Sequence, residues 1–382
     1  MHCTKHLLAG ILFLAFTSGF SQELTQEFID AGYTLTDLGS VNLLPSRYGG
    51  LTIRSDQPNT LYICGSANDS PGAVYTVGLV RDPTSHRITG FSGDAVLYMA
   101  APNNDGGIFF APNGTLLFTR YSMNELGQIL PNSTYISTPL TELGIASSVG
   151  SIALVPFGYP GAGNIIIASY NAAIVYNVPF TIDGTGLYVF TAPTSEVNIN
   201  EMASGPEGIA YIPSGSAGFT NLSMVVSSYG QGTVVVYEVG AEGLPKVETG
   251  RLMVTGLSGA EGAWIDPVTG DFLFSTFGGG DKVVRISGFE KPSAVGDNQL
   301  TGDYGLKVLQ DPGSPGITVV LGKDIDASGT IISIKNTNGQ ELSQQQASGQ
   351  STTIDVSALA SGMYVVRITE GTIVRTAKFI RR

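Results

Sequence analysis

The feature that most constrains this chain is a short pattern that recurs along its middle: a glycine, an apolar strand, a tight turn and a second apolar strand. The clearest copy runs from Ser258 to Phe277, where Glu261-Gly262 opens the first strand and Asp266-Pro267 marks the turn. Looser copies begin at Tyr48, Asp105, Val149 and Glu207. Apolar strands of this length, bounded by turn residues, predict an all-β fold.

The spacing of the copies indicates the architecture. With Gly50, Gly107, Gly150, Gly208 and Gly262 as anchors, successive copies are 57, 43, 58 and 54 residues apart. A period of about 50 residues, with room for four short strands, is typical of a β-propeller. The pattern predicts five blades, or six if one of the wider spacings contains a degenerate blade. The strand at 33–38 has no blade of its own, so we expect it to close the ring by joining the last blade.

The two ends of the chain differ from this array. Residues 1–21 combine a basic start with an apolar run from Leu7 to Phe16, which is the pattern of a secretory signal peptide. We expect the propeller over 22–289 and a linker over 290–303, where loop-forming residues gather. Residues 304–382 alternate apolar and polar positions around an Asn-Gly turn, which predicts a small antiparallel β-sandwich. No other apolar run is long enough for a transmembrane segment.

The C-terminal residues carry several motifs in order: Ile354–Ser357, Leu359, Ser361–Val366 and the basic end Lys378–Arg382. This set resembles the C-terminal sorting domain of proteins exported by the type IX secretion system of Bacteroidetes bacteria. Asp311-Pro312 stands where that family usually has Asn-Pro. The resemblance implies that the secretion machinery is a partner of this domain. It also implies export across the outer membrane, followed by release or attachment to the cell surface.

The segment Gly256–Gly280 makes the array similar to a group of bacterial secreted propeller proteins of unassigned function. The Glu-Gly and Asp-Gly strand openings also resemble, more distantly, those of gluconolactonase-like and NHL-type propellers. Neither resemblance implies an activity, because the first group has none assigned and glycine-opened strands are common to propellers.

Charge and cysteine content exclude several kinds of partner and site. The formal net charge is -12, and residues 22–303 contain 25 acidic and 10 basic side chains. This acidic body argues against nucleic acid or an anionic membrane as a partner. Removal of residues 1–21 would leave Cys64 alone, so neither a disulfide framework nor a cysteine-based metal site is expected. We expect a monomer.

Propeller topology places two sets of side chains on one face. The first set precedes the innermost strands and consists of Arg47, Tyr48, Asp105, Ser148, Glu207 and Glu261. The carboxylates of Asp105, Glu207 and Glu261 could bind a hard cation such as Ca²⁺ at a central funnel. They could also supply a general acid and base if their environments differ. The alternative is that they are solvated or bond to neighbouring backbone groups.

The second set follows the second strands and repeats an aromatic residue in most blades. Its members are Arg120, Tyr121, Tyr170, Asn171, Tyr229, Phe277 and Asp281. Aromatic rings beside polar groups could stack on sugars or hold a peptide. The alternative is that they cap the cores of the blades.

These residues support two classes of function. The first hypothesis is a non-catalytic propeller that binds an extracellular glycan or protein, because the chain has no nucleophile motif and no histidine cluster. The alternative is a Ca²⁺-dependent hydrolase or lactonase, or a carbohydrate-active propeller, that uses the acidic funnel.

Overall fold

The structure is a computed structural model. It describes residues 22–291 apart from 112, 157 and 184, and residues 306–381 apart from 310–315, 323–324, 337–339, 361 and 372. The predicted signal peptide, most of the predicted linker and the Asn-Gly turn of the C-terminal domain lie outside the described residues. Within the described part of the chain, no helix is long and apolar enough to cross a membrane.

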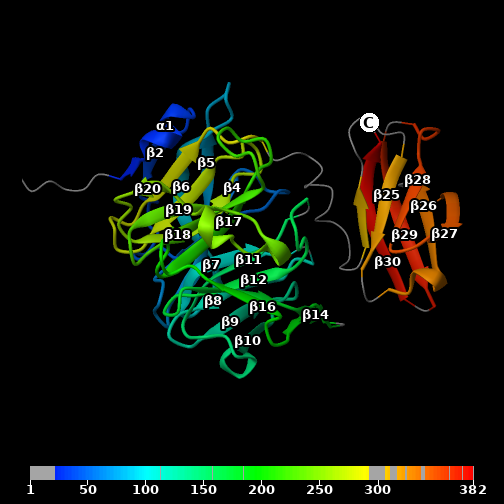
Figure 1. The fold of residues 1–382 in the computed structure, drawn as a ribbon, viewed down its shortest axis with the longest axis horizontal. Coiled ribbons are helices and arrows are strands. Elements are labelled where there is room, and N and C mark those ends of the chain that lie inside the picture. Colours follow the sequence, from blue (N-terminus) through cyan, green and yellow to red (C-terminus); the bar gives the residue numbers. More distant parts are fainter. Residues whose placement is uncertain are drawn as a thin grey trace, which may run out of the picture.

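Residues 22–291 form five antiparallel sheets that are the blades of a propeller (Figure 1). Blade 1 contains β3 (Leu51–Ile53), β4 (Thr60–Gly65), β5 (Ala73–Arg81) and β6 (Ile88–Ala100). Blade 2 contains β7 (Asn104–Phe110), β8 (Leu116–Arg120), β9 (Glu125–Ile129) and β10 (Tyr135–Pro139). Blade 3 contains β11 (Val149–Leu154), β12 (Ile165–Ser169), β13 (Ile174–Val178) and β16 (Ser195–Asn198), with the hairpin β14 (Phe180–Ile182) and β15 (Tyr188–Phe190) inserted before β16.

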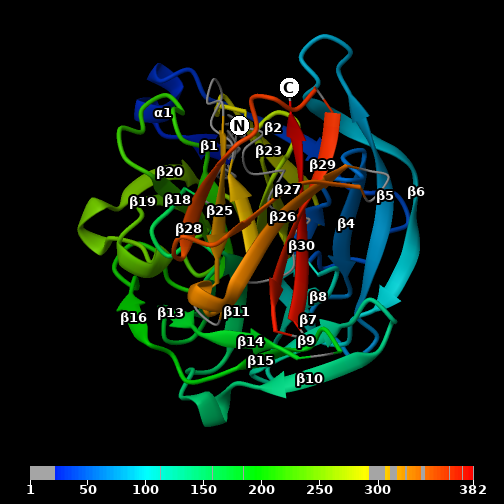
Figure 2. The same ribbon diagram turned by 90° about the vertical axis from the view of Figure 1, so that its right-hand side faces the viewer.

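The last two blades are completed by the N-terminal segment. Blade 4 contains β17 (Pro206–Ile212), β18 (Ser223–Ser228), β19 (Thr233–Glu238) and β20 (Arg251–Thr255), and β1 (Glu23–Leu24) pairs with β20. Blade 5 contains β21 (Ala260–Ile265), β22 (Phe272–Thr276) and β23 (Val283–Ser287), and β2 (Thr34–Gly39) is its outer strand. The expectation that the N-terminal strand closes the ring is therefore confirmed. Figure 2 shows the blades following one another around a centre, from β4–β6 through β9 and β10 to β18–β20.

A single turn of helix, α1 (Gln26–Asp30), joins β1 to β2 and is fixed by aromatic packing. Phe28 lies 5.8 Å from both Tyr33 and Phe219, measured between ring centroids, and Tyr33 lies 4.6 Å from Phe289. The N-terminal segment thus contributes buried rings as well as two strands to blades 4 and 5. Short 3-10 turns lie at Thr141–Leu143, Ala241–Gly243, Val247–Thr249 and Ala327–Gly329.

The repeated glycines are explained by the close approach of the innermost strands. A Cβ on Gly50 would lie 2.6 Å from the Gly106 oxygen, and one on Gly107 would lie 2.5 Å from the Ile152 nitrogen. A Cβ on Gly262 would lie 2.6 Å from the Gly50 Cα. Gly150 and Gly208 meet the innermost strands of blades 4 and 5 in the same way. The five blades therefore close at the centre only because these positions carry no side chain.

Hydroxyl groups on the second strands reinforce the contact between blades. The Thr119 hydroxyl of blade 2 donates to the Gly150 oxygen of blade 3 at 3.0 Å, and the Ser275 hydroxyl of blade 5 donates to the Gly49 oxygen before blade 1 at 2.6 Å. The Ser227 hydroxyl of blade 4 donates to the Glu261 oxygen of blade 5. These bonds satisfy backbone carbonyl groups that water does not reach.

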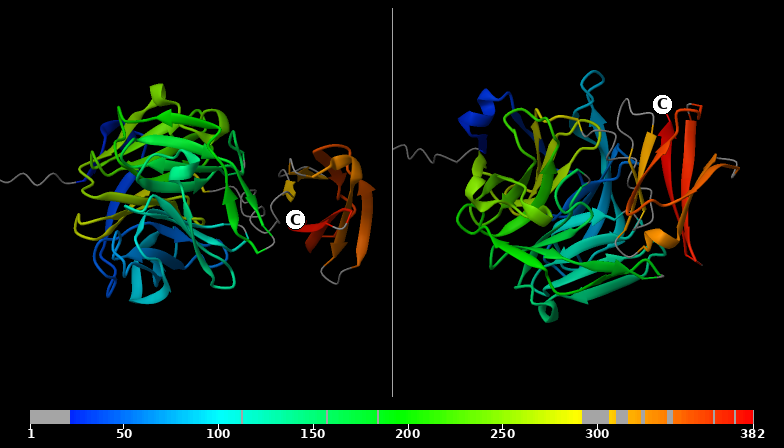
Figure 3. Two further views of the ribbon diagram at one scale, coloured as in Figure 1. Left: turned by 90° about the horizontal axis from the view of Figure 1, so that it is seen from below. Right: turned by 45° about the vertical axis from the view of Figure 1, so that its right-hand side comes forward.

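The C-terminal domain is a sandwich of two antiparallel sheets, drawn in orange and red in Figure 3. One sheet contains β24 (Leu306–Leu309), β25 (Gly316–Leu321) and β28 (Ser351–Asp355). The other has the order β27 (Glu341–Gln346), β26 (Thr330–Asn336), β29 (Gly362–Glu370) and β30 (Ile373–Arg381). Ile317, Val319, Ile332, Val366 and Phe379 are buried between the sheets. The predicted alternation of apolar and polar positions thus forms a two-sheet core.

Candidate functional site

The three carboxylates selected from the sequence converge near the centre of the propeller. Asp105 lies on β7, Glu207 on β17 and Glu261 on β21, so each comes from the innermost strand of a different blade. One oxygen from each lies within 4.8 Å of the others. They do not line an open funnel, because the three residues are 1%, 3% and 1% exposed. The alternative that these three side chains are solvated is therefore excluded.

Several oxygens in this cluster receive no hydrogen bond from an N–H or hydroxyl group of the described residues. These buried oxygens are Asp105 Oδ2, Glu207 Oε2 and Glu261 Oε1. The other Asp105 oxygen, Oδ1, lies 3.0 Å from the Asn68 side-chain nitrogen when that amide is oriented to satisfy both of its groups. Buried carboxylate oxygens without a donor are costly, so the cluster calls for a proton or a cation.

Glycines of neighbouring blades provide the space for Glu207. A Cβ on Gly106 would lie 2.7 Å from Glu207 Oε2, and a Cβ on Gly150 would lie 2.8 Å from the same atom. The carboxylate of Glu207 therefore lies against the bare backbone of blades 2 and 3. The glycines that allow the blades to close also leave room for this side chain.

Burial dominates the proton affinity of all three groups. It raises the pKa of Asp105 to about 8, and it raises the pKa of Glu207 and Glu261 well above the usual value for glutamate. The negative charge of Asp105 raises the pKa of both glutamates further. A hydrogen bond between Asp105 and Glu261 lowers the pKa of the first and raises that of the second.

The charged and polar neighbours proposed from the sequence have structural roles. Tyr48 is buried, and its hydroxyl accepts from the Val41 N–H at 3.0 Å. Arg120 is buried, forms an ion pair with Glu125 and donates to the Pro102 oxygen at 3.0 Å. Neither side chain is available at an open surface, because strand geometry turns both toward internal partners.

Arg47 and Asp281 join the loops of blades 1 and 5. The Arg47 side chain forms an ion pair with Asp69. The Arg47 backbone N–H donates to Asp281 Oδ1 at 2.7 Å. The Arg47 guanidinium therefore pairs with Asp69 rather than with the central carboxylates. In the described part of the chain, no lysine or arginine forms an ion pair with Asp105, Glu207 or Glu261.

The aromatic residues of the second set do form a continuous row. The ring centroids of Tyr170 and Tyr229 are 6.0 Å apart, and those of Tyr229 and Phe277 are 6.1 Å apart. These three rings are half-buried, whereas Tyr121 and Asn171 are exposed. Burial and then the charge of Glu207 raise the pKa of Tyr170 to about 12. The row therefore lies on the same face of the propeller as the cluster and within its electrostatic range.

Two contributors to the site were not selected from the sequence. Asn68 lies in a loop of blade 1 with a φ of 66°, and asparagine in such a loop is an ordinary turn signal. Cys64 is fully buried on β4, and its thiol interacts electrostatically with Glu261 and Asp105. Neither residue stands directly before an innermost strand, which is the position that identified Asp105, Glu207 and Glu261 in the sequence.

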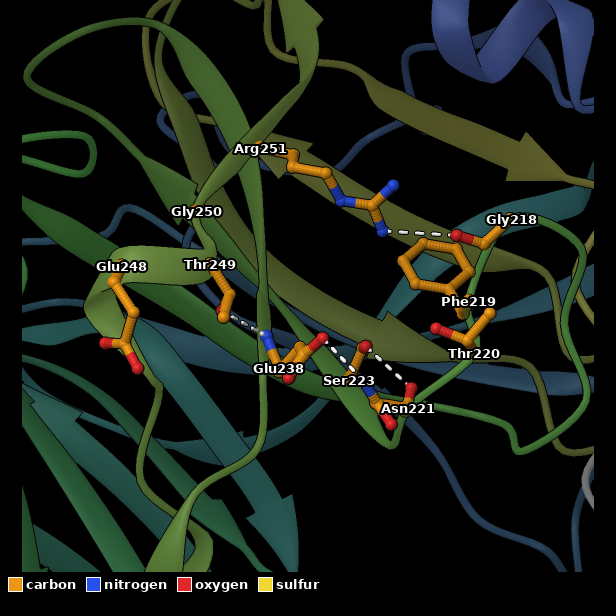
Figure 4. Close-up of a pocket in the computed structure, with 10 residues that line it drawn as sticks. All are labelled: Gly218, Phe219, Thr220, Asn221, Ser223, Glu238, Glu248, Thr249, Gly250 and Arg251. Atoms are coloured by element: carbon orange, nitrogen blue, oxygen red, sulfur yellow. Dashed lines mark hydrogen bonds between the residues drawn. The ribbon is translucent and has the colours of Figure 1, made fainter.

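A separate cavity of about 440 Å³ opens at the other face of blade 4 (Figure 4). It lies near the start of β18, whereas the aromatic row follows the ends of the second strands. Its polar groups bond to one another: Asn221 donates to Glu238 at 2.7 Å, and Arg251 donates to the Gly218 oxygen at 3.3 Å. The side chains of Asn221, Glu238 and Arg251 in its lining are thus already paired.

Comparisons with known proteins bear on the two domains differently. Residues 312–382 match the family described as the secretion system C-terminal sorting domain. No curated protein sequence matches the chain. Among solved structures, the chain is similar to virginiamycin B lyase from Staphylococcus aureus, with 13% identity over 67% of this chain and 99% of that one, at a TM-score of 0.36.

Two further structures show comparable likeness. One is a putative 6-phosphogluconolactonase from Bacteroides uniformis, with 14% identity over 80% of this chain and 85% of that one, at a TM-score of 0.37. The other is PorZ, a surface component of the type IX secretion system of Porphyromonas gingivalis, with 14% identity over 86% of this chain and 51% of that one, at a TM-score of 0.28. At this level of likeness no activity is transferred. The chain is a propeller protein that carries a type IX secretion system C-terminal sorting domain, which implies secretion to the cell surface or exterior.

Proposed function

We propose that this protein is a non-catalytic binding protein of the cell surface or exterior, and that its aromatic row binds carbohydrate. The observation that carries the proposal is the row of Tyr170, Tyr229 and Phe277, whose rings lie next to one another across three blades. The half-buried rings keep a fixed geometry and still offer part of their surface to a ligand. Sugar rings have flat apolar faces bordered by hydroxyl groups, which suit aromatic faces beside polar groups.

Polar groups at the edge of the row fit this ligand class. Asn171 is exposed directly after Tyr170, and its amide can donate and accept hydrogen bonds. Tyr121 is exposed after β8, and its hydroxyl has the same double capacity. The two tyrosine hydroxyls of the row add further polar contacts. Arg120 directly precedes Tyr121, but it is buried and forms an ion pair with Glu125, so it offers no free positive charge to an acidic ligand.

The hydrolase alternative has less support. Asp105, Glu207 and Glu261 are almost completely buried, so a substrate has no route to them without movement of the innermost strands. A general acid or base must lie within hydrogen-bond reach of the substrate. A histidine could act as a general acid or base, but His86, the histidine among the described residues, is exposed in a turn of blade 1. The geometry therefore supports binding better than hydrolysis.

A glycan array with the secreted protein tests this proposal. We expect a hit, and we expect Tyr229→Ala to weaken it at least tenfold, because Tyr229 is the central ring of the row. Tyr98→Ala is the control, since Tyr98 is 41% exposed on the outer strand of blade 1. An array without any hit would refute the carbohydrate assignment. So would equal binding by the two variants, or a ligand that proves to be a peptide.

A further inference from the structure

We infer that the centre of the propeller is a binding site for one divalent cation, with Ca²⁺ as the ion that fits its ligands. Calcium–oxygen distances in proteins are about 2.3–2.6 Å, so two oxygens on opposite sides of one ion are about 4.8 Å apart. The candidate oxygens of Asp105, Glu207 and Glu261 all lie within 4.8 Å of one another. The three oxygens are therefore close enough together for one ion to lie among them.

The unpaired oxygens are the second, independent reason for a ligand at this point. Each carboxylate has one buried oxygen that receives no hydrogen bond from an N–H or hydroxyl group of the described residues: Asp105 Oδ2, Glu207 Oε2 and Glu261 Oε1. In folded proteins such buried acceptors are nearly always satisfied by a donor, an ordered water or an ion. An ion among the three carboxylates would satisfy all of these oxygens at once.

The surroundings have the features of a built site. Asn68 donates to the second oxygen of Asp105 at 3.0 Å, which fixes the orientation of that carboxylate. Gly106 and Gly150 leave the space that Glu207 Oε2 occupies. Second-sphere hydrogen bonds of this type orient the groups that contact a metal. The Asn68 amide therefore orients Asp105, and the backbone at Gly106 and Gly150 confines Glu207.

Charge selects the kind of ion. Three ionised carboxylates would be buried together, and no described lysine or arginine pairs with any of them. Isolated buried charges are strongly unfavourable unless they are paired or coordinate a metal. Oxygen ligands favour a hard cation, and Ca²⁺ tolerates irregular geometry where Mg²⁺ requires a near-octahedral shell. The inference concerns the interior of the propeller and does not depend on the ligand of the aromatic row.

The first test measures calcium directly. The secreted protein is stripped with chelator, dialysed against calcium chloride and analysed for bound metal and melting temperature. We expect about one Ca²⁺ per chain and a higher melting temperature than in chelator, because the ion binds the folded state only. Glu207→Gln and Glu261→Gln should bind Ca²⁺ at least tenfold more weakly, while Glu142→Gln, an exposed control, should bind as the wild type does.

A second measurement keeps the test valid if a variant is less stable. Tb³⁺ replaces Ca²⁺ at oxygen sites, and the nearby Tyr170 and Tyr229 should sensitise its emission. We expect emission from the wild type and from Glu142→Gln, and its loss from Asp105→Asn and Glu261→Gln measured below their melting temperatures. Absence of bound calcium with an unchanged melting temperature would overturn the inference and leave shared protons as the state of the cluster. Equal calcium binding by the wild type and the central variants, or tighter binding of Mg²⁺, would overturn it as well.

Discussion

The closure of the propeller by glycines can be tested with two alanine substitutions in the same blade. Gly50 lies at the innermost strand of blade 1, where an added Cβ would be 2.6 Å from the Gly106 oxygen and 2.7 Å from the Ile108 Cγ2. Gly90 lies on the outer strand β6, where an added Cβ would meet no atom within 4 Å. Neither glycine has a positive φ, so alanine tests space rather than backbone strain.

The expected size of the effect follows from these distances. Moving the Gly106 oxygen from 2.6 Å to the 3.4 Å of ordinary contact requires blades 1 and 2 to separate by about 0.8 Å at the centre. Overpacking of this kind costs about 1–3 kcal/mol, and the upper end is expected because a backbone atom must move. The unfolding entropy is about 2.1 cal/mol/K per residue, so about 3 kcal/mol lowers the melting temperature of a propeller of about 270 residues by about 5 °C.

The assay is thermal unfolding followed by circular dichroism for the wild type and both variants. Gly50→Ala should melt about 5 °C lower, whereas Gly90→Ala should match the wild type or gain up to about 1 kcal/mol from the reduced freedom of the unfolded chain. Equal melting temperatures for the two variants would show that the centre has room for a Cβ. The explanation of the repeated glycines would then be refuted.

Four further predictions concern other parts of the chain. Arg81→Ala should destabilise the protein by about 3–5 kcal/mol in denaturant unfolding, because the Arg81 guanidinium nitrogens lie 2.7 and 2.9 Å from the carboxylate oxygens of the fully buried Asp266. Lys246→Ala removes an exposed ion pair and should change the free energy of unfolding little. Similar losses of stability in the two variants would contradict the prediction. Removal of residues 22–39 should make the protein aggregate, because it uncovers the edge of β23 and the aromatic partners of Phe28. Size-exclusion chromatography measures this, and a monodisperse product would contradict the prediction. The Cys64 thiol should react with a thiol reagent only after unfolding, since it is fully buried and its pKa is raised by burial; rapid labelling of the native protein would disprove this. Deletion of 304–382 should retain the protein in the periplasm on cell fractionation, and normal export would contradict the role of the sorting domain.

The ring of blades could be predicted from the sequence because its steric requirement appears directly as glycine. Each anchor, from Gly50 to Gly262, marks a point where two backbones approach, and no other residue fits there. The outer strand of blade 2 gave no comparable signal. In β10 (Tyr135–Pro139) exposed and half-buried residues alternate, and the strand is held to β9 by backbone pairing and one side-chain hydrogen bond, from Gln128 to the Thr138 hydroxyl at 2.9 Å. Such a strand has neither an apolar run nor a glycine requirement that a sequence could reveal.

The site was only partly predictable for a related reason. Topology correctly brings Asp105, Glu207 and Glu261 to one face, because each precedes or opens an innermost strand. Their burial depends on how far the side chains reach across the axis, which no local pattern encodes. The position of Tyr48 before an innermost strand predicts that it lies with these carboxylates. In the structure its hydroxyl instead accepts a hydrogen bond from the Val41 backbone N–H. Position along a strand predicts the face of the propeller, whereas the direction of a side chain depends on pleat and packing.

The glycines and the carboxylates are two aspects of one geometry. Blades whose innermost strands carried side chains would stand farther apart, and acidic groups between them would meet water rather than one another. Here Gly106 and Gly150 bring the backbones of blades 2 and 3 close to Glu207, and the remaining space is filled by carboxylate oxygens that receive no hydrogen bond from an N–H or hydroxyl group of the described residues. Tight closure thus converts acidic residues at the blade entrances into a buried anionic cluster. A chain that retains such a cluster without a paired lysine or arginine has a reason to bind a cation there, because the ion offsets the repulsion that the closure itself creates.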